Sequence, residues 1–532
     1  MNVGMQEVSN TDPRWSLPAE ARVSETGLQW ACMALFLAAL CIFLWVGLFN
    51  VHQPILEGHG FRQTQTALSA YWMQMEGFRL AYETPVLGAP WSIPFEFPLF
   101  QALVAAVASL AGADLDAAGR VVSMLCGAAV CIPLYRSLRL LDIEPAAAHC
   151  ANALYLTTPV YLFWSSTFMI EALALLLTVG AGYYMVKVYR RGPTRRDLAL
   201  FGILLTLALL QKVTTALPLV FVGLACFGWR ALGDLRRGSG WRHPQVRTGL
   251  QVLAVAGVAL VIGYAWVKYT DLVKSRNELG RFLTSGALSA WNYGPLDLRF
   301  RKEFLVDVLF ERILGPSSGW GLGLLAIAAL VRREDRPAQR VAVLGLVLFL
   351  VPIAIFANLH FVHNYYQSAN LVFLSAAIAV AVFSTTKPPG VRATAAAPVV
   401  IAVLVAANLY FFHHTYYQAR AASITVANNQ TLKLAAFLRA YTPADRPIVI
   451  LGNDWSSELA YYARRKSVTP SAWMGKEMEA VRTPQRFLPA PPSAIVSCPE
   501  DKAEVLRAAI MATYPRAQLN VVGTCHVYLL PA

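Results

Sequence analysis

The chain contains repeated apolar runs, most of which are long enough to cross the hydrocarbon core of a bilayer as a helix of about 20 residues. Hydrophobic residues make up 56% of the 532 residues and charged residues only 14%, against about 25% charged in soluble proteins. A disordered chain, a fibrous repeat and a small disulfide scaffold are therefore excluded. We expect a mostly α polytopic membrane helical bundle with eleven spans, near 28–50, 118–135, 147–165, 172–189, 198–211, 213–229, 249–267, 317–331, 341–357, 366–384 and 394–412.

The basic residues lie between the apolar runs, not on one face or in one domain, so the net charge of +14 does not indicate a nucleic-acid partner. Alternate loops hold 18 Lys and Arg but only six acidic residues. Because short cytoplasmic loops carry an excess of Lys and Arg, we expect these loops to be cytoplasmic. They are 136–144, 187–197, 230–247, 332–340 and 387–392.

One apolar stretch, Phe97–Ala111, would reverse this orientation if it crossed the membrane, so we predict a helix lying in or dipping into the outer interface. The N-terminal segment 1–27 is then cytoplasmic, and residues 28–412 form the transmembrane domain. The predicted outer loops are 51–117, 268–316 and 358–365.

The tail, residues 413–532, holds no spanning run and is predicted to be a small extracytoplasmic α/β domain. Strands are expected at Pro447–Gly452, Ser493–Ser497 and within Leu519–Leu530, and helices at Ser456–Arg465 and Glu500–Tyr514. Cys498 and Cys525 are candidates for a disulfide, because adjacent strands bring Cβ atoms near the reach of such a bridge.

The first outer loop is rich in aromatic residues and proline and carries groups that can do chemistry. Glu57, His59, Arg62 and Gln63 lie close together in EGHGFRQTQTA, and Glu96 lies in PFEFPLFQ. Carboxylates and imidazole can accept a proton, and arginine can hold a phosphate. A solvated loop with an amphipathic helix is the alternative interpretation of this segment.

Further polar residues lie at the outer ends of spans. Glu171 follows WSSTFMI, Lys212 lies in LALLQKVTT, and His363 and Tyr365 lie in LHFVHNYYQ. Ionisable groups near the membrane interior are costly and mark functional sites, although Lys212 could also extend to the interface and His363 could be a packing residue. The predicted topology places Glu171, Lys212 and His363 at the same outer face as Glu96.

The order HGFRQTQTA, PFEFPLFQ, GR, WSSTFMIE, LLQK, HNYY resembles the GT-C glycosyltransferases, and most of all the bacterial protein-mannosyltransferase and aminoarabinose-transferase superfamily (glycosyltransferase family 39-like). The likeness spans about residues 51–370. The EFPL segment is similar to the E-x-P-P/L element of that superfamily, which carries Glu96 and Pro98. The resemblance implies substrate-binding roles for Arg62, Gln63, Arg120, Glu171, Lys212, His363 and Tyr365.

The proton acceptor stays open among Glu96, His59 and Glu57. Many relatives carry an aspartate in an R-Q-x-D-T string, where this chain has Gln65. His59 is the nearest match to the other frequent aspartate position.

The resemblance implies an inverting hexosyl or pentosyl transferase that uses a polyprenyl-phosphate-linked sugar at the outer face of the inner membrane of the cell envelope. Its acceptor would be a lipid, a glycan or a protein. The loop Asp271–Arg312 would cover the site, with Trp291 and Tyr293 as a sugar platform. No nucleotide-binding, hydride-transfer or zinc-hydrolase motif is present. A divalent cation stays open, with its ligands unknown.

Two other classes remain open from the sequence. A transporter or flippase of a lipid-linked saccharide would also have many spans, although here the ionisable residues gather at one face and do not follow a path. A non-catalytic membrane scaffold would use the α/β tail as a partner domain.

The loop charges give a direct test of topology. We expect alkaline phosphatase fused near residue 420 to be active and the same enzyme fused near residue 193 to be inactive, because only the first would be exported. The opposite pattern of activities would contradict the orientation and would place the polar cluster on the cytoplasmic side.

Overall fold

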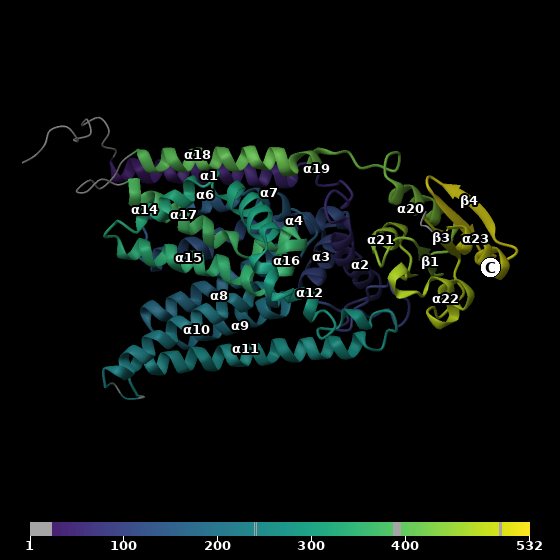
Figure 1. Cartoon of the computed structure of the whole chain (residues 1–532), viewed down its shortest axis with the longest axis horizontal. Coiled ribbons are helices and arrows are strands. Elements are labelled where there is room, and N and C mark those ends of the chain that lie inside the picture. The colour runs from purple at the N-terminus through teal and green to yellow at the C-terminus, as the bar shows by residue number, and fades with distance from the viewer. Residues whose placement is uncertain (1–23, 239, 241, 387–394, 499–502, 532) are drawn as a thin grey trace, which may run out of the picture.

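The molecule is elongated, with a helical bundle at one end and a small α/β domain at the other (Figure 1). The computed structural model describes residues 24–238, 240, 242–386, 395–498 and 503–531. The predicted fold class, a polytopic helical bundle with a C-terminal α/β domain, is confirmed.

Among these described residues, seven helical segments have the length and apolarity to cross a membrane. They are α1 (Glu25–Leu48), α4 with α5 (Leu115–Ala129, Cys131–Leu140), α8 (Glu171–Arg191), α10 (Val213–Arg236), α11 (Pro244–Lys274), α15 (Arg336–Ile355) and α18 with α19 (Ala396–Phe412, Gln418–Ala421). An eighth is counted if the π-helix Glu303–Leu314, α13 (Gly315–Ser317) and α14 (Leu322–Leu330), bent by 85°, form one span.

The other three predicted spans are helical but short or broken. They are α6 with α7 (Pro145–Thr157, Pro159–Trp164), α9 (Arg195–Gln211) and α17 (Leu371–Thr386). Pro159 has no backbone N–H to continue α6, so the helix breaks at Thr158. Most residues of α17 are buried by neighbouring helices. Helix length therefore supports seven or eight spans, fewer than the eleven predicted from apolar runs.

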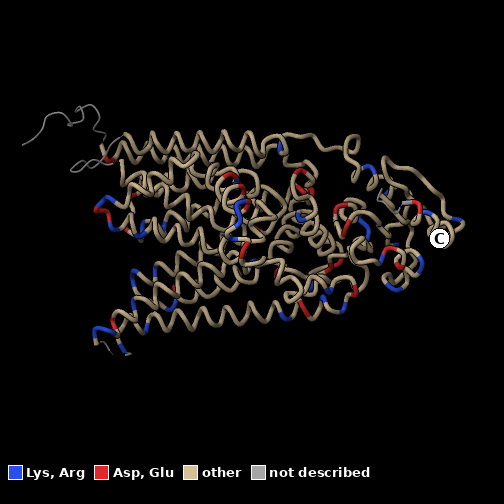
Figure 2. Tube along the Cα trace, viewed as in Figure 1, with Lys and Arg blue, Asp and Glu red and all other residues tan. Residues whose placement is uncertain are grey.

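The described parts of the basic loops lie at the end of the bundle away from the α/β domain (Figure 2). Lys387 and Arg392 of the predicted 387–392 loop lie outside the described residues, as does the N-terminal segment up to residue 23. The first helix begins at Glu25, three residues before the predicted start, because Ser24 caps it by accepting a hydrogen bond from the backbone N–H of Gly27. The last helical run continues to Ala421, beyond the predicted boundary at 412.

An outer layer of short helices lies between the bundle and the α/β domain (Figure 1). It contains α2 (Gly60–Glu76), α3 (Leu99–Ala111), α12 (Ser289–Tyr293) and α16 (Ala357–Val362). The predicted interfacial stretch is α3, whose 13 residues span about 20 Å, less than the roughly 30 Å hydrocarbon core.

The C-terminal domain is a five-stranded sheet in the order β2-β1-β3-β5-β4, with β2, β1 and β3 parallel and the other pairs antiparallel. The strands are β1 (Ile448–Leu451), β2 (Ser467–Val468), β3 (Ala494–Ser497), β4 (Gln518–Val522) and β5 (Cys525–Leu529). The helices are α20 (Gln430–Tyr441), α21 (Glu458–Ala463), α22 (Glu477–Arg482) and α23 (Ala503–Thr513). The sequence predicted β1, β3, β4, β5, α21 and α23. It missed the two-residue β2 and the helices α20 and α22.

The first outer loop fastens this domain to the bundle by extending its sheet. The backbone N–H groups of Ser467 and Thr469 donate to the carbonyls of Pro85 and Val86 at 3.0 and 2.8 Å. From the second outer loop, the buried amide of Asn277 donates to the carbonyls of Leu87, Gly88 and Pro90. Both outer loops and the tail domain therefore form one packed unit.

A disulfide joins Cys498 to Cys525, as the sequence suggested, with a Cα–Cα distance of 4.2 Å. Ser497 pairs with His526 in the antiparallel ladder between β3 and β5, which places the two cysteines opposite each other. The bridge closes the end of the ladder.

Loss of this disulfide should loosen the tail domain without unfolding the bundle. The Cys498→Ser/Cys525→Ser variant should lose about 2–4 kcal/mol of domain stability, because the unfolded loop is no longer constrained. The measurement for the variant is the rate of limited proteolysis in the tail of the full chain. The disulfide itself is tested by a thiol count on the denatured parent protein. Six free thiols before reduction agree with the structure, whereas eight would contradict it.

Candidate active site

The segment that begins α2 is held in a fixed and unusual conformation. His59 precedes the helix with φ 43°, a left-handed conformation that costs a non-glycine residue about 1–3 kcal/mol. The side-chain amide of Gln63 donates to the carbonyl of Gly58 at 2.7 Å and accepts from the N–H of Phe168 at 2.9 Å. Gln63 is fully buried and is used by the backbone, which argues against the substrate-binding role predicted for it.

Arg62 and Glu96 form an ion pair between α2 and the segment before α3. Arg62 Nη2 lies 3.2 Å from Glu96 Oε2, and Gln101 donates to Glu96 Oε1 at 2.8 Å. Arg62 also donates to Gln65, the residue that stands where relatives carry aspartate. The hydroxyl of Tyr82 donates to the carbonyl of Glu96 and fixes the backbone there. The Glu96 carboxylate is therefore oriented from both of its oxygens.

A second ion pair joins Glu171 and Lys212, with 2.6 Å between Nζ and Oε1. Glu171 lies in the first turn of α8, where the helix dipole favours an anion. Lys212 stands between the C-terminus of α9 and the N-terminus of α10, so the two helix dipoles oppose each other there and the Glu171 carboxylate is its main electrostatic partner. The ammonium also lies 4.2 Å from the ring centroid of Tyr366. Lys212 thus has an internal carboxylate partner. This carboxylate is present without any bound phosphate.

Aromatic and imidazole rings surround these pairs. The ring of His59 lies 5.4 Å from Trp164, 5.5 Å from His363 and 5.2 Å from Tyr365. Trp291 of the second outer loop lies 6.2 Å from His363. The predicted covering loop therefore does reach the cluster.

Burial keeps both histidines neutral near pH 7. It lowers the pKa of His59, and a hydrogen bond with Asn364 opposes this only in part. Burial also lowers the pKa of His363, to about 4, with further lowering from His59 and Lys212. In this state His363 could donate a hydrogen bond to a phosphate but would not bring a positive charge.

The two ion pairs belong to one electrostatic site. Burial alone would lower the pKa of Arg62, but the carboxylates of Glu96 and Glu171 raise it overall. A guanidinium from α2 is thus influenced by carboxylates of both pairs. We call the seven residues His59, Arg62, Glu96, Glu171, Lys212, His363 and Tyr365 the outer cluster.

Glu57 and Arg120 lie elsewhere, in a closed ion pair without solvent exposure. Arg120 donates to both carboxylate oxygens, at 2.5 and 2.8 Å, and Arg420 approaches Glu57 at 3.4 Å. Arg120 also donates to the carbonyls of Gln53 and Ser166. This geometry argues against the predicted roles of Glu57 as base and Arg120 as substrate ligand, and it favours a structural role for both.

Two neighbours of the cluster, Trp164 and Lys274, were missed from the sequence. Trp164 begins the WSSTFMI motif that precedes Glu171, so the motif itself could have indicated it. Lys274 is buried, with Nζ 2.7 Å from the carbonyl of Leu283 and 5.8 Å from the ring centroid of Phe95. It ends a long helix like any interfacial lysine, so no local pattern distinguishes it.

A metal site is not evident in the part of the chain that the structure describes. Within it, no three His, Cys, Asp or Glu side chains come together in a way that could hold an ion. The carboxylates of the cluster are instead paired with Arg62 and Lys212.

The fold, a bundle of membrane-capable helices with a small C-terminal α/β domain, is that of the GT-C glycosyltransferases. A model of the dolichyl-phosphate-mannose-protein mannosyltransferase family matches residues 93–264.

Solved structures agree along almost the whole chain. ArnT from Cupriavidus metallidurans bound to undecaprenyl phosphate has a TM-score of 0.62 at 14% identity, covering 95% of this chain and 98% of ArnT. The Archaeoglobus fulgidus oligosaccharyltransferase gives 0.51 at 15% identity, with 93% and 73% covered. The mycobacterial arabinofuranosyltransferase AftD gives 0.54 at 13%, with 96% and 40% covered. No curated protein sequence matches. The resemblance inferred from the motifs is thus confirmed at the level of the fold.

The Glu171–Lys212 pair should be needed for stability. Lys212→Met leaves a buried carboxylate without its partner and should cost about 3–5 kcal/mol, whereas Lys212→Met/Glu171→Gln should recover much of that loss. Thermal unfolding in detergent measures both variants. Lys187→Met, which removes the partner of Asp197 in a more exposed pair, is the control and should cost less. Equal stability of the Lys212→Met and parent proteins would contradict the pairing.

Proposed function

We propose that this chain is an inverting glycosyltransferase that moves a hexosyl or pentosyl group from a polyprenyl-phosphate donor to an acceptor at the outer face of the inner membrane. The observation that carries the proposal is the outer cluster, which combines two cations with two carboxylates in a GT-C fold. The likeness to ArnT, solved with undecaprenyl phosphate, supports a lipid-phosphate donor.

The reaction is a single displacement. An acceptor oxygen or nitrogen attacks the anomeric carbon and forms the new glycosidic bond, while the bond from that carbon to the phosphate oxygen breaks. The leaving polyprenyl phosphate gains one negative charge, which Lys212 and Arg62 stabilise. The proton of the acceptor passes to a side chain of the cluster.

Glu96 is our assignment for the proton acceptor. Its carboxylate is oriented by Gln101 and Arg62 and is largely shielded from water, with 8% of the side chain exposed. His59 is the competing group, because its lowered pKa leaves a neutral imidazole at neutral pH. Glu57 is set aside, because both of its oxygens bind Arg120.

The second outer loop supports a sugar-binding role beside the cluster. Trp291 and Tyr293 are about half exposed, and Tyr293 stacks on Phe356 at 5.7 Å. Exposed aromatic faces near polar groups suit a sugar ring. The acceptor is proposed only as an envelope lipid, glycan or protein, and no step is assigned to a divalent cation.

Transfer from a radiolabelled polyprenyl-phosphate sugar tests the function and the base together. Glu96→Gln should lower the rate by about 10²–10⁴-fold, as expected for loss of a general base, and His59→Ala should lower it less. Glu76→Gln is the matched control, because Glu76 pairs with Lys466 in the same outer layer and should keep the parent rate.

Three results would count against this proposal. Near-parent transfer by Glu96→Gln together with an inactive His59→Ala would move the base to His59. Absence of transfer by the folded parent with every donor and envelope fraction would favour a transporter or a scaffold. Full donor binding by the stable Lys212→Met/Glu171→Gln variant would remove Lys212 from the phosphate site.

A further inference from the structure

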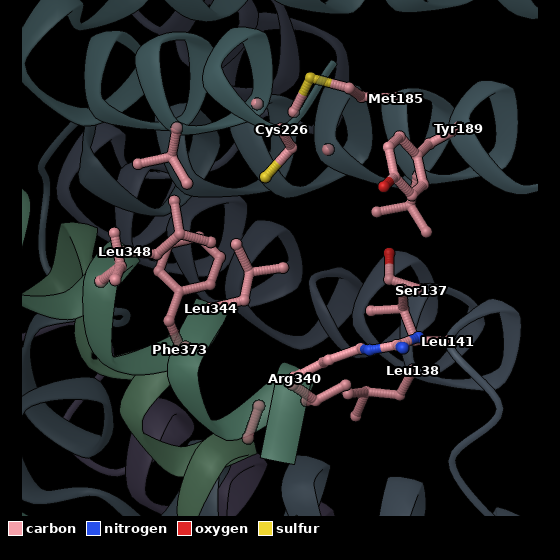
Figure 3. Close-up of a pocket in the computed structure, with 18 of the residues that line it drawn as sticks. Ser137, Leu138, Leu141, Met185, Tyr189, Cys226, Arg340, Leu344, Leu348 and Phe373 are labelled. Carbon is pink, nitrogen blue, oxygen red and sulfur yellow. The ribbon is translucent and has the colours of Figure 1, made fainter. Parts of the chain in front are cut away.

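A second site lies in the half of the bundle away from the α/β domain. It is a pocket of about 910 Å³ between α8 and α10 on one side and α5, α15 and α17 on the other (Figure 3). Its volume is at the upper end of the range for small-ligand sites. The deep wall is apolar and includes Leu138, Met185, Leu219, Leu344, Leu348 and Phe373.

The pocket opens sideways, toward the surface that faces lipid. Val343 and Val347 of α15 line it and are 61% and 38% exposed. On the facing helix, Ala225 and Cys226 line it and are also exposed. A hydrocarbon chain could therefore enter from the bilayer without passing through water.

One end of the pocket is polar and carries an arginine, Arg340, without an ion-pair partner among the described residues. Ser137, Tyr189 and Arg340 lie together at one end of the pocket in Figure 3. Arg190 is already paired with Asp142. For Arg340, in contrast, no hydrogen bond or ion pair is found within the described part of the chain. Its guanidinium, next to an apolar cavity, is complementary to an anionic head group.

We propose that this pocket binds an anionic phospholipid of the cytoplasmic leaflet, with a fatty-acyl chain between α10 and α15 and the phosphate on Arg340. Basic pockets between helices on the cytoplasmic side suit such head groups, because that leaflet is rich in anionic lipid. Arginine binds a phosphate with two parallel N–H donors, and the hydroxyls of Ser137 and Tyr189 add further donors. The choice of leaflet rests on the orientation given with the proposed function, but the binding itself does not.

Binding is measured by native mass spectrometry of the full chain in detergent, with phosphatidylglycerol as the probe and phosphatidylcholine as the neutral reference. We expect phosphatidylglycerol to bind more tightly. Arg340→Gln should weaken it by about fivefold or more, since one basic contact near the membrane surface contributes about 1 kcal/mol. Arg336→Gln, on the same helix but outside the pocket, should bind within about twofold of the parent.

A second variant tests where the acyl chain lies. Ala225→Trp should fill the pocket opening and reduce binding, whereas Phe221→Trp, exposed on the same helix outside the pocket, should not. Equal binding of both lipids, or parent-like binding by Arg340→Gln or by Ala225→Trp, would overturn the proposal. Displacement of phosphatidylglycerol by equimolar polyprenyl phosphate would assign the pocket to a polyprenyl chain and would also overturn it. None of these lipid-binding measurements requires glycosyl transfer, so a negative binding result can be told apart from a failure of the proposed transferase function.

Discussion

The ion triad of Glu57, Arg120 and Arg420 is the interaction on which the outer half of the molecule depends. Arg120 comes from α4, Arg420 from α19 and Glu57 from the first outer loop, so one buried carboxylate joins three distant segments. Arg420 also donates to the carbonyl of Gly47 near the end of α1. Removal of one partner from such a group leaves a buried charge uncompensated, which is far more costly than loss of an exposed pair. The triad thus fixes the loop that presents His59 and Arg62.

The outer cluster follows from where helices end. Glu171 begins α8, Lys212 separates α9 from α10, and His59 precedes α2, so these three groups stand at helix termini. Helix ends leave backbone groups unpaired and carry partial charges, and they are also where the chain leaves the apolar layer. Packing of these ends at one level gathers ionisable groups there without burying any of them alone.

Sequence reasoning predicted the fold class, a helix in each of the eleven apolar runs and four of the five tail strands, because apolar periodicity determines these features locally. It overestimated the number of spans, because apolar content alone does not distinguish short or broken helices from helices that cross the bilayer. It also grouped Glu96, Glu171, Lys212 and His363 correctly at one end of the bundle. It could not separate Arg62, which lies in the cluster, from Gln63 and Arg120, which serve the backbone and Glu57. That distinction depends largely on contacts between distant segments, such as Gln63 with Phe168 and Arg120 with Glu57. A motif match indicates which residues belong to the site, but only the packing of the chain shows whether their polar atoms remain available to bind a substrate.

The two proposed sites share the helices α8 and α10. On α10, Lys212 precedes the helix and Leu219 of the pocket lies seven residues later, about 10 Å along the axis. On α8, Glu171 and Val179 of the pocket are separated by eight residues, about 12 Å. A lipid in the pocket would contact both α8 and α10, the two helices whose outer ends carry the Glu171–Lys212 pair. Pro218 lies between Lys212 and Leu219 and interrupts the backbone hydrogen bonding of α10, whereas α8 has no internal proline, so α8 is the more direct structural connection between the two sites.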